Sequence, residues 1–76
     1  MTKEGLKQTI GVNIRDMLEE AGITQNELSE ETGISRSTIS HYINGDKLPS
    51  VNNIINIAYA LDCEITDLLD MYCRIV

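Results

Sequence analysis

Two short helical segments joined through a single glycine constrain this chain more than any other feature. Thr24 and Glu27, three residues apart, form a capping box that predicts the start of the first segment, and Gly33 ends it. Ser35 then caps the second segment, which ends at about residue 44. Between them there is room for only a three- or four-residue turn, so the two helices must cross sharply. Gly33 stands where the backbone needs a positive φ, which glycine adopts without penalty.

Apolar residues recur at helical spacing on both sides of this pair, which predicts three more helices. The helix before the pair ends at about Ala21, the next begins behind Ser50, and a short last one covers about residues 65–71. No segment alternates apolar and polar residues with period two, as a strand would. We therefore expect an all-α fold of five helices forming one compact domain over residues 1–76. The apolar residues at helical spacing, and the residues expected in the core with them, are Leu6, Ile10, Ile14, Met17, Leu18, Ala21, Leu28, Thr32, Ile34, Ile39, Tyr42, Ile43, Ile54, Ile57, Ala58 and Leu61.

The charge of the chain is unevenly distributed. The formal net charge is -6, which is the wrong sign for a protein that binds nucleic acid. Most of the acid falls in two blocks, residues 16–32 with six acidic and no basic side chains and residues 62–76 with four acidic and one basic. Residues 33–61 hold Arg36 and Lys47 against Asp46, a local charge of +1. The segment that contains the glycine turn is therefore compatible with a phosphate-facing surface.

Several protein classes are not expected. No apolar run approaches the roughly 20 residues of a membrane span, and the N-terminus does not resemble a secretory signal, so we expect a cytoplasmic location. Cys63 and Cys73, with His41 as the single histidine, are too few for a zinc site. We expect two reduced thiols, Cys63 as a small core residue, with a redox or intermolecular disulfide role left open. His41 has no evident nucleophile beside it, so neither an enzyme nor a metal or other cofactor is expected.

A specific set of short motifs surrounds the glycine turn. The turn and the following helix contain Gly33-Ile34-Ser35-Arg36-Ser37-Thr38-Ile39-Ser40 and Asn44-Gly45. The flanking helices contain Ile10-Gly11, Ile14-Arg15, Pro49-Ser50, Ile57-Ala58 and Ala60-Leu61. Together these motifs resemble the Cro/repressor-type (XRE-like) helix-turn-helix family over about residues 10–69. The resemblance implies a compact five-helix lambda-repressor-like DNA-binding domain, with the helix-turn-helix motif at about residues 24–44 in its second and third helices.

The face of the third helix, residues 35–44, that lies opposite its apolar positions is polar. This face is either plainly solvated or inserted into the major groove, where an arginine can contact guanine with two hydrogen bonds. The candidate base-reading residues are Arg36, Ser37, Ser40 and His41, and by resemblance Gln25. The resemblance also implies that the DNA phosphates are held by Thr24, Asn44, Lys47 and Ser50.

The expected function is a sequence-specific, DNA-binding transcriptional regulator that acts as a repressor. One motif contacts one half-site of double-stranded DNA, so a homodimer is expected. The apolar C-terminal tail, residues 70–76, is expected to pack across the two-fold axis or back onto the first helix. A protein partner such as a toxin or another regulator is left open. The alternative is a protein-interaction module of the same fold, anti-repressor or antitoxin-like, with weak or no DNA binding, and the net charge motivates it.

Four positions depart from the pattern of the family. Leu18 and Ile43 are apolar where members often carry an arginine and a glutamate that form a buried ion pair. Asp62 stands where the family usually has a glycine that ends the fourth helix. Glu64 stands where a serine-like residue usually caps the last helix. The last two departures make the start of that helix the least defined part of the predicted fold.

Overall fold

A computed structural model describes residues 3–70 of the chain and contains five helices and no strand in that range. The all-α architecture expected from the sequence is confirmed. Four of the five helices begin or end within a residue or two of the positions that the capping signals predict. The helices are α1 (Lys3–Ala21), α2 (Gln25–Thr32), α3 (Arg36–Ile43), α4 (Val51–Ala60) and α5 (Ile65–Leu69).

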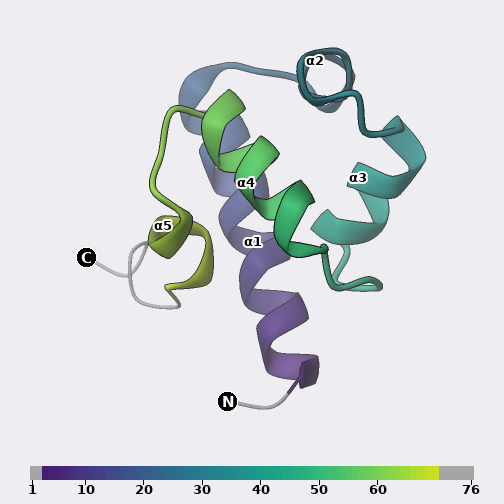
Figure 1. Cartoon of the computed structure of the whole chain (residues 1–76), viewed down its shortest axis with the longest axis vertical. Helices are drawn as coiled ribbons and strands as arrows, with labels where there is room; N and C mark the ends of the chain where they lie inside the picture. Colours follow the sequence, from purple (N-terminus) through teal and green to yellow (C-terminus); the bar gives the residue numbers. More distant parts are fainter. Residues whose placement is uncertain (1–2, 71–76) are drawn as a thin grey trace.

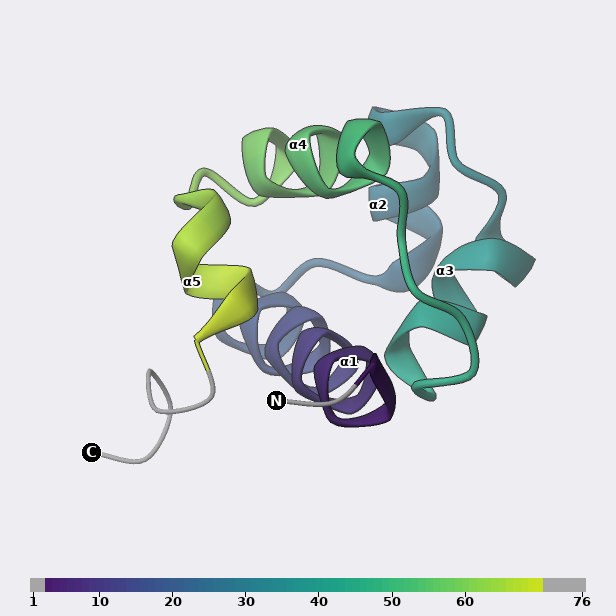
Figure 2. The same ribbon diagram turned by 60° about the horizontal axis from the view of Figure 1, so that its bottom comes forward.

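The long first helix is the element on which the others assemble. Helices α3 and α5 both pack against α1, while α2 packs against α3 and α4, and α4 packs against α5. Figure 1 shows α3 and α5 on opposite sides of α1, with α4 in front of it. The second view places α4 and α1 on opposite faces of the molecule (Figure 2). The first and last helices of the chain therefore lie side by side, although more than 40 residues separate them in sequence.

The core lies between these helices and consists mainly of the residues predicted for it. Six large side chains are fully buried: Ile10, Ile14, Leu28, Ile39, Ile57 and Leu68. Leu18 is also buried, and Ile43 packs against the core, so both apolar departures from the family pattern join the same cluster. Leu6, Ile54, Leu61 and Thr32 are less buried than predicted, because they lie at the edge of the helix packing. Cys63 likewise packs against the core. Ala21, the last residue of α1, is exposed.

The last helix ends earlier than the sequence predicted. We expected it to reach Met71, but α5 ends at Leu69, and the backbone of Asp70 is extended with ψ 115°. The cause is a side chain from α1: Asn13 Nδ2 donates to the carbonyl of Leu68 at 2.8 Å and to that of Asp70 at 3.0 Å. This contact meets carbonyl groups that a helix end leaves without partners. Met71 itself and the remainder of the predicted tail lie outside the described residues.

The connection from α4 to α5 accommodates both remaining departures. Asp62 has a φ of 54°, so it adopts the left-handed conformation for which the family uses glycine. Glu64 precedes α5, and its backbone N–H donates to Oδ2 of Asp67 at 3.0 Å. A carboxylate in the first turn thus closes the start of α5 without a serine-like cap.

Candidate nucleic-acid interface

Hydroxyl groups and one glycine fix the turn between α2 and α3. Gly33 has a φ of 75°, and its N–H donates to the carbonyl of Ser29 at 2.9 Å. Ser29 Oγ donates across the turn to the carbonyl of Ile34 at 2.6 Å, and the Ile34 N–H donates to Thr32 Oγ1 at 3.2 Å. The side chain of Ile34 is buried, as the sequence predicted. The crossing of α2 and α3 is therefore defined by local hydrogen bonds as well as by the core.

Contacts with α1 and α4 hold α3 in place. Ile39 and Tyr42 are buried, and the Tyr42 hydroxyl accepts a hydrogen bond from Asn53 Nδ2 on α4 at 2.8 Å. On the other side, Gly11 of α1 lies directly against the end of α3. A Cβ atom at Gly11 would lie 2.5 Å from the carbonyl oxygen of Tyr42 and 2.6 Å from that of Ile43. Only a residue without a side chain allows α1 and α3 to approach this closely.

The predicted base-reading residues of α3 lie on its outward side. Ser35 caps the helix, its Oγ accepting from the Thr38 N–H at 3.1 Å. We call the side formed by Arg36, Ser37, Ser40, His41 and Asn44 the α3 outer face. All of these residues are exposed except Ser40, which is half-buried. Arg36 is the first residue of α3, and Gln25, the remaining predicted base-reading residue, is the exposed first residue of α2.

One contact on the α3 outer face was not predicted. His41 Nδ1 lies 3.4 Å from Oδ2 of Asp46 in the loop after α3, and both side chains are well exposed. The loop turns back at Gly45, and the Asp46 N–H donates to the His41 carbonyl at 2.9 Å, which explains the proximity. Asp46 therefore places an acidic group beside a candidate base-reading residue, and the helical periodicity gave no signal for it.

Two of the predicted phosphate-binding residues also cap helices. Thr24 Oγ1 accepts from the Glu27 N–H at 3.1 Å, and the Thr24 N–H donates to Glu27 Oε1 at 3.1 Å. These two hydrogen bonds form the capping box. Ser50 Oγ accepts from the Asn53 N–H at 3.2 Å. Lys47 is exposed in the loop between α3 and α4. Helix α2 packs against both α3 and α4, and the loop that holds Lys47 leads from the end of α3 to the start of α4.

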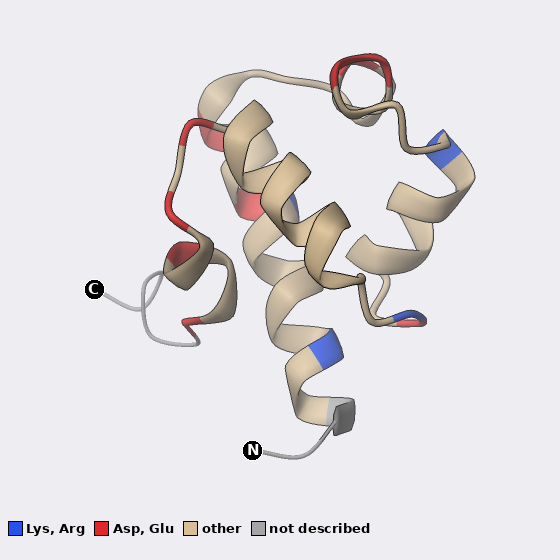
Figure 3. Cartoon of the chain, in the orientation of Figure 1, with Lys and Arg blue, Asp and Glu red and all other residues tan. Residues whose placement is uncertain are grey.

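The charges are separated in space as well as in sequence. Figure 3 shows Lys and Arg at the start of α3, in the loop after it and on α1, while α2 and the connection from α4 to α5 are acidic. Within α3 itself, Arg36 is the one residue among lysine, arginine, aspartate and glutamate. Helix α4 has no charged residue. Most of the acid that produces the net charge of -6 lies on α1, α2 and the connection from α4 to α5, although α2 packs against α3 and Asp46 contacts His41 on the α3 outer face.

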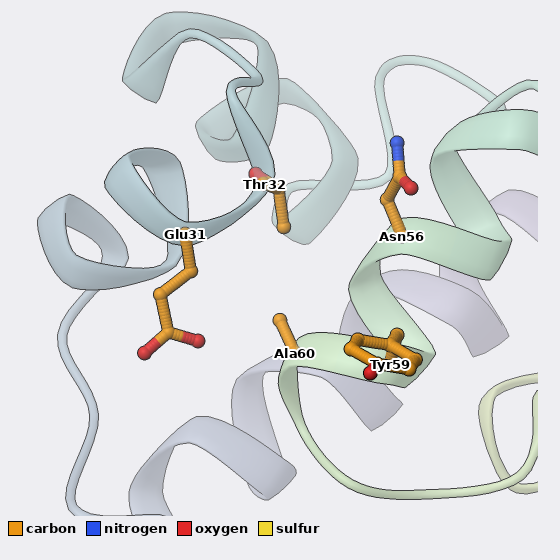
Figure 4. Close-up of a pocket in the computed structure, with 5 residues that line it drawn as sticks. All are labelled: Glu31, Thr32, Asn56, Tyr59 and Ala60. Atoms are coloured by element: carbon orange, nitrogen blue, oxygen red, sulfur yellow. The ribbon is translucent and has the colours of Figure 1, made fainter.

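The surface between α2 and α4 holds a shallow hollow of about 340 Å³. Its lining residues are Glu31, Thr32, Asn56, Tyr59 and Ala60 (Figure 4). None of the predicted base- or phosphate-binding residues lines it. Among residues 3–70, no three His, Cys, Asp or Glu side chains come together as a metal-binding group. The described part of the chain also has no helix that is both long and apolar enough to cross a membrane.

A comparison with protein families decides what this arrangement is. The family model HTH_3, described as helix-turn-helix, matches residues 14–68 of the chain. The chain belongs to the HTH_3 family. Membership of this family of XRE-type regulators confirms the resemblance seen in the sequence and indicates a DNA-binding regulator. No curated protein sequence matches the chain.

Several solved structures have the same fold as this chain. The restriction-modification controller protein C.AhdI from Aeromonas hydrophila is 29% identical with a TM-score of 0.78, over 82% of this chain and 94% of that one. The clp gene regulator ClgR from Corynebacterium glutamicum is 26% identical with a TM-score of 0.81, over 84% of this chain and 68% of that one. An HTH_3 family transcriptional regulator from Vibrio cholerae is 18% identical with a TM-score of 0.84, over 88% of this chain and 38% of that one. This last likeness shows the fold alone.

Proposed function

We propose that this HTH_3 protein is a transcriptional repressor that binds operator DNA as a homodimer. Each copy inserts α3 into the major groove of one half-site and reads base edges with the α3 outer face. The observation that carries the proposal is this polar face, with Arg36 at its first position and the acidic blocks of the chain elsewhere. The similarity to C.AhdI, a controller protein, and to ClgR, a gene regulator, supports a role in regulation.

The residues take different roles in this proposal. Arg36 makes a bidentate contact to guanine, while Ser37, Ser40 and Gln25 select among neighbouring bases. His41 contributes through its ring, which Asp46 orients by the contact at Nδ1. Around the recognition helix, Lys47 and the side chains of Thr24, Asn44 and Ser50 contact phosphates. The third amides of α2 and α4 donate to the cap side chains, and the two amides before them in each helix favour phosphate oxygens.

Two substitutions test the proposal, because they should weaken DNA binding in different ways. The operator is first found by selection from random duplexes at low salt and by testing the DNA upstream of the gene. Arg36→Ala should weaken binding to that site by about 1–3 kcal/mol and relax the preference at one base pair of each half-site. Lys47→Ala should weaken binding to all duplexes alike and lower the salt slope by about one unit for each phosphate that is no longer neutralised. Fluorescence polarisation over a salt series measures both effects.

Arg15→Ala is the matched control, since it removes an exposed cation from α1 without touching the α3 outer face. Its base preference should equal that of the parent protein. If Arg36→Ala changes neither affinity nor base preference on the selected site, the α3 outer face is not the reading surface.

A second candidate function is the protein-interaction module, which one observation favours: Glu27, Glu30 and Glu31 all lie on α2, and Glu30 and Glu31 are exposed. An acidic helix beside the α3 outer face suits a basic protein partner better than a phosphate backbone. The same selection experiment separates the two candidates. Failure to enrich or bind any duplex at low salt, with the protein folded, would favour the interaction module over the repressor.

A further inference from the structure

The outer side of α4 carries a row of apolar side chains that the other described residues leave partly or largely exposed. Val51, Ile55 and Tyr59 are 72%, 44% and 88% exposed. They are spaced four residues apart, so they lie along one side of the helix, and we call them the α4 ridge. Val51 and Tyr59 are the two most exposed large hydrophobic side chains in residues 3–70. A continuous row of this kind is typical of a surface that another molecule covers.

The charge around the α4 ridge restricts what can cover it. The ten residues of α4 include no charged side chain, and the ridge is flanked by the uncharged Asn52 and Asn56. At the Tyr59 end, the ridge borders the hollow that Tyr59 lines together with Glu31 of α2. By contrast, α2 and the connection to α5 are acidic (Figure 3). Two copies of a chain with a net charge of -6 repel each other least where neither presents a charge. Among the helices, α4 is the one that offers a second copy an apolar and neutral surface.

We propose that two copies of this chain meet through their α4 ridges, antiparallel about a two-fold axis at Ile55. In this arrangement Ile55 packs against Ile55 of the second copy. Val51, at one end of the ridge, packs against Tyr59 of the second copy, and Tyr59 against Val51. A two-fold interface requires such reciprocal pairs, and here a small side chain meets a large one at both ends. The inference rests on the homodimer proposed above and specifies its interface.

The placement of α3 agrees with a dimer that binds DNA. Figure 1 shows α4 in front of α1 with α3 to one side of it. The axis that pairs two antiparallel α4 helices face to face runs perpendicular to both of them. An element that is displaced from α4 along the direction of this axis therefore lies on the same side of the dimer in both copies. Because α1 lies on the opposite face from α4 (Figure 2), it does not obstruct the contact, and both α3 helices are presented together.

Sedimentation of matched lysine variants tests whether the α4 ridge is the interface. Ile55 and Val12 are similarly exposed, at 44% and 41%, but Val12 lies on α1. Ile55→Lys should raise the dimer dissociation constant by about tenfold or more, while Val12→Lys should leave it unchanged. Tyr59→Lys should act like Ile55→Lys, and because Tyr59 is 88% exposed its replacement does not disturb folding. Circular dichroism verifies that each variant is folded.

Disulfide trapping tests the antiparallel register, in full-length protein with Cys63→Ala and Cys73→Ser. Ile55→Cys should cross-link to itself on oxidation, because the two residues face each other at the axis. Neither Val51→Cys nor Tyr59→Cys should cross-link when it is the only variant present. In each case the cysteine lies about 12 Å along the helix from the same cysteine in the second copy, which is too far for a disulfide. An equal mixture of these two variants should form the mixed dimer. Self-linking of Val51→Cys or Tyr59→Cys, or no mixed dimer, would overturn the antiparallel pairing.

The outcomes also separate this inference from the proposed function. A dimer that persists in both Ile55→Lys and Tyr59→Lys overturns the α4 interface but leaves a homodimeric repressor intact. A wild-type protein that stays monomeric at high micromolar concentration, with and without operator DNA, overturns the interface and the homodimer together. A wild-type dimer that Ile55→Lys dissociates, with weaker operator binding and an unchanged base preference, supports both.

Discussion

At the level of single residues, Asp62 carries a backbone conformation that does not suit its side chain. Its φ of 54° is the one positive value among the described non-glycine residues. Asp62→Gly should therefore stabilise the domain by about 0.5–1 kcal/mol, somewhat offset by the greater freedom of glycine in the unfolded chain. Asp62→Asn, which also removes the charge but keeps a Cβ, is the matched control and should change stability less. Urea unfolding followed by circular dichroism measures both, and a glycine variant no more stable than the asparagine variant would contradict the argument.

Gly11 is the opposite case, a position where any side chain is excluded by neighbouring backbone. A Cβ there would lie 2.5 Å and 2.6 Å from two carbonyl oxygens at the end of α3. Gly11→Ala should destabilise the domain by about 1–3 kcal/mol, a loss that the better helix propensity of alanine, about 1 kcal/mol, does not cancel. Glu19→Ala, an exposed position on the same helix, controls for propensity. Thermal unfolding compares the two, and equal midpoints would show that α3 moves aside without cost.

At the level of elements, the capping chemistry explains why four helices were predicted well. Thr24, Ser35 and Ser50 each accept a hydrogen bond from the third helical N–H that follows, as their sequence positions imply. The end of α5 was missed because no local signal marks it. Its termination depends on Asn13, which is 55 and 57 residues away from the carbonyl groups it contacts. Periodicity and caps describe neighbours along the chain, and they do not show which distant polar side chain reaches a helix end.

In the candidate site, too, the sequence predicts the features that depend on neighbours along the chain and misses those that depend on how a loop folds back. The exposed side of α3 follows from the burial of Ile39 and Tyr42, so the side on which Arg36 lies could be predicted from periodicity alone. The contact between His41 and Asp46 could not, because it depends on how the loop turns back at the end of the helix. The roles of these residues toward DNA remain predictions.

The docking of α5 gives a prediction at this scale. Asn13 is only 3% exposed, and its amide is a donor for two carbonyl groups at the end of α5. Asn13→Ala should cost about 1–3 kcal/mol, because buried acceptors are left without their donor. Hydrogen exchange should accelerate most in α5, and Asn52→Ala on the exposed side of α4 should leave it unchanged. Uniform acceleration in all five helices would show that Asn13 supports the whole fold and not the docking of α5.

For the whole molecule, the net charge governs how quickly DNA is found. Glu30→Gln together with Glu31→Gln changes the formal net charge from -6 to -4, with both sites exposed on α2. This double variant should associate with operator DNA several-fold faster at low salt and dissociate at an unchanged rate, since long-range charge acts mainly on encounter. Arg15→Gln, which makes the charge -7, should do the reverse. Stopped-flow association at rising salt is the measurement, and differences that persist at high salt would point to direct contacts instead.

The hydrogen bonds between Asn13 and the end of α5 also set an order of events during synthesis. The side of α1 that Leu68 covers stays open until the residues of α5 have been made. At about 5–20 residues per second, a ribosome needs roughly 3–11 seconds to travel from residue 13 to residue 70. During that interval the nascent chain can form α1 but cannot close the domain around it. A ribosome that stalls before residue 68 therefore holds a chain with an uncovered apolar helix, which is a substrate for chaperones and proteases.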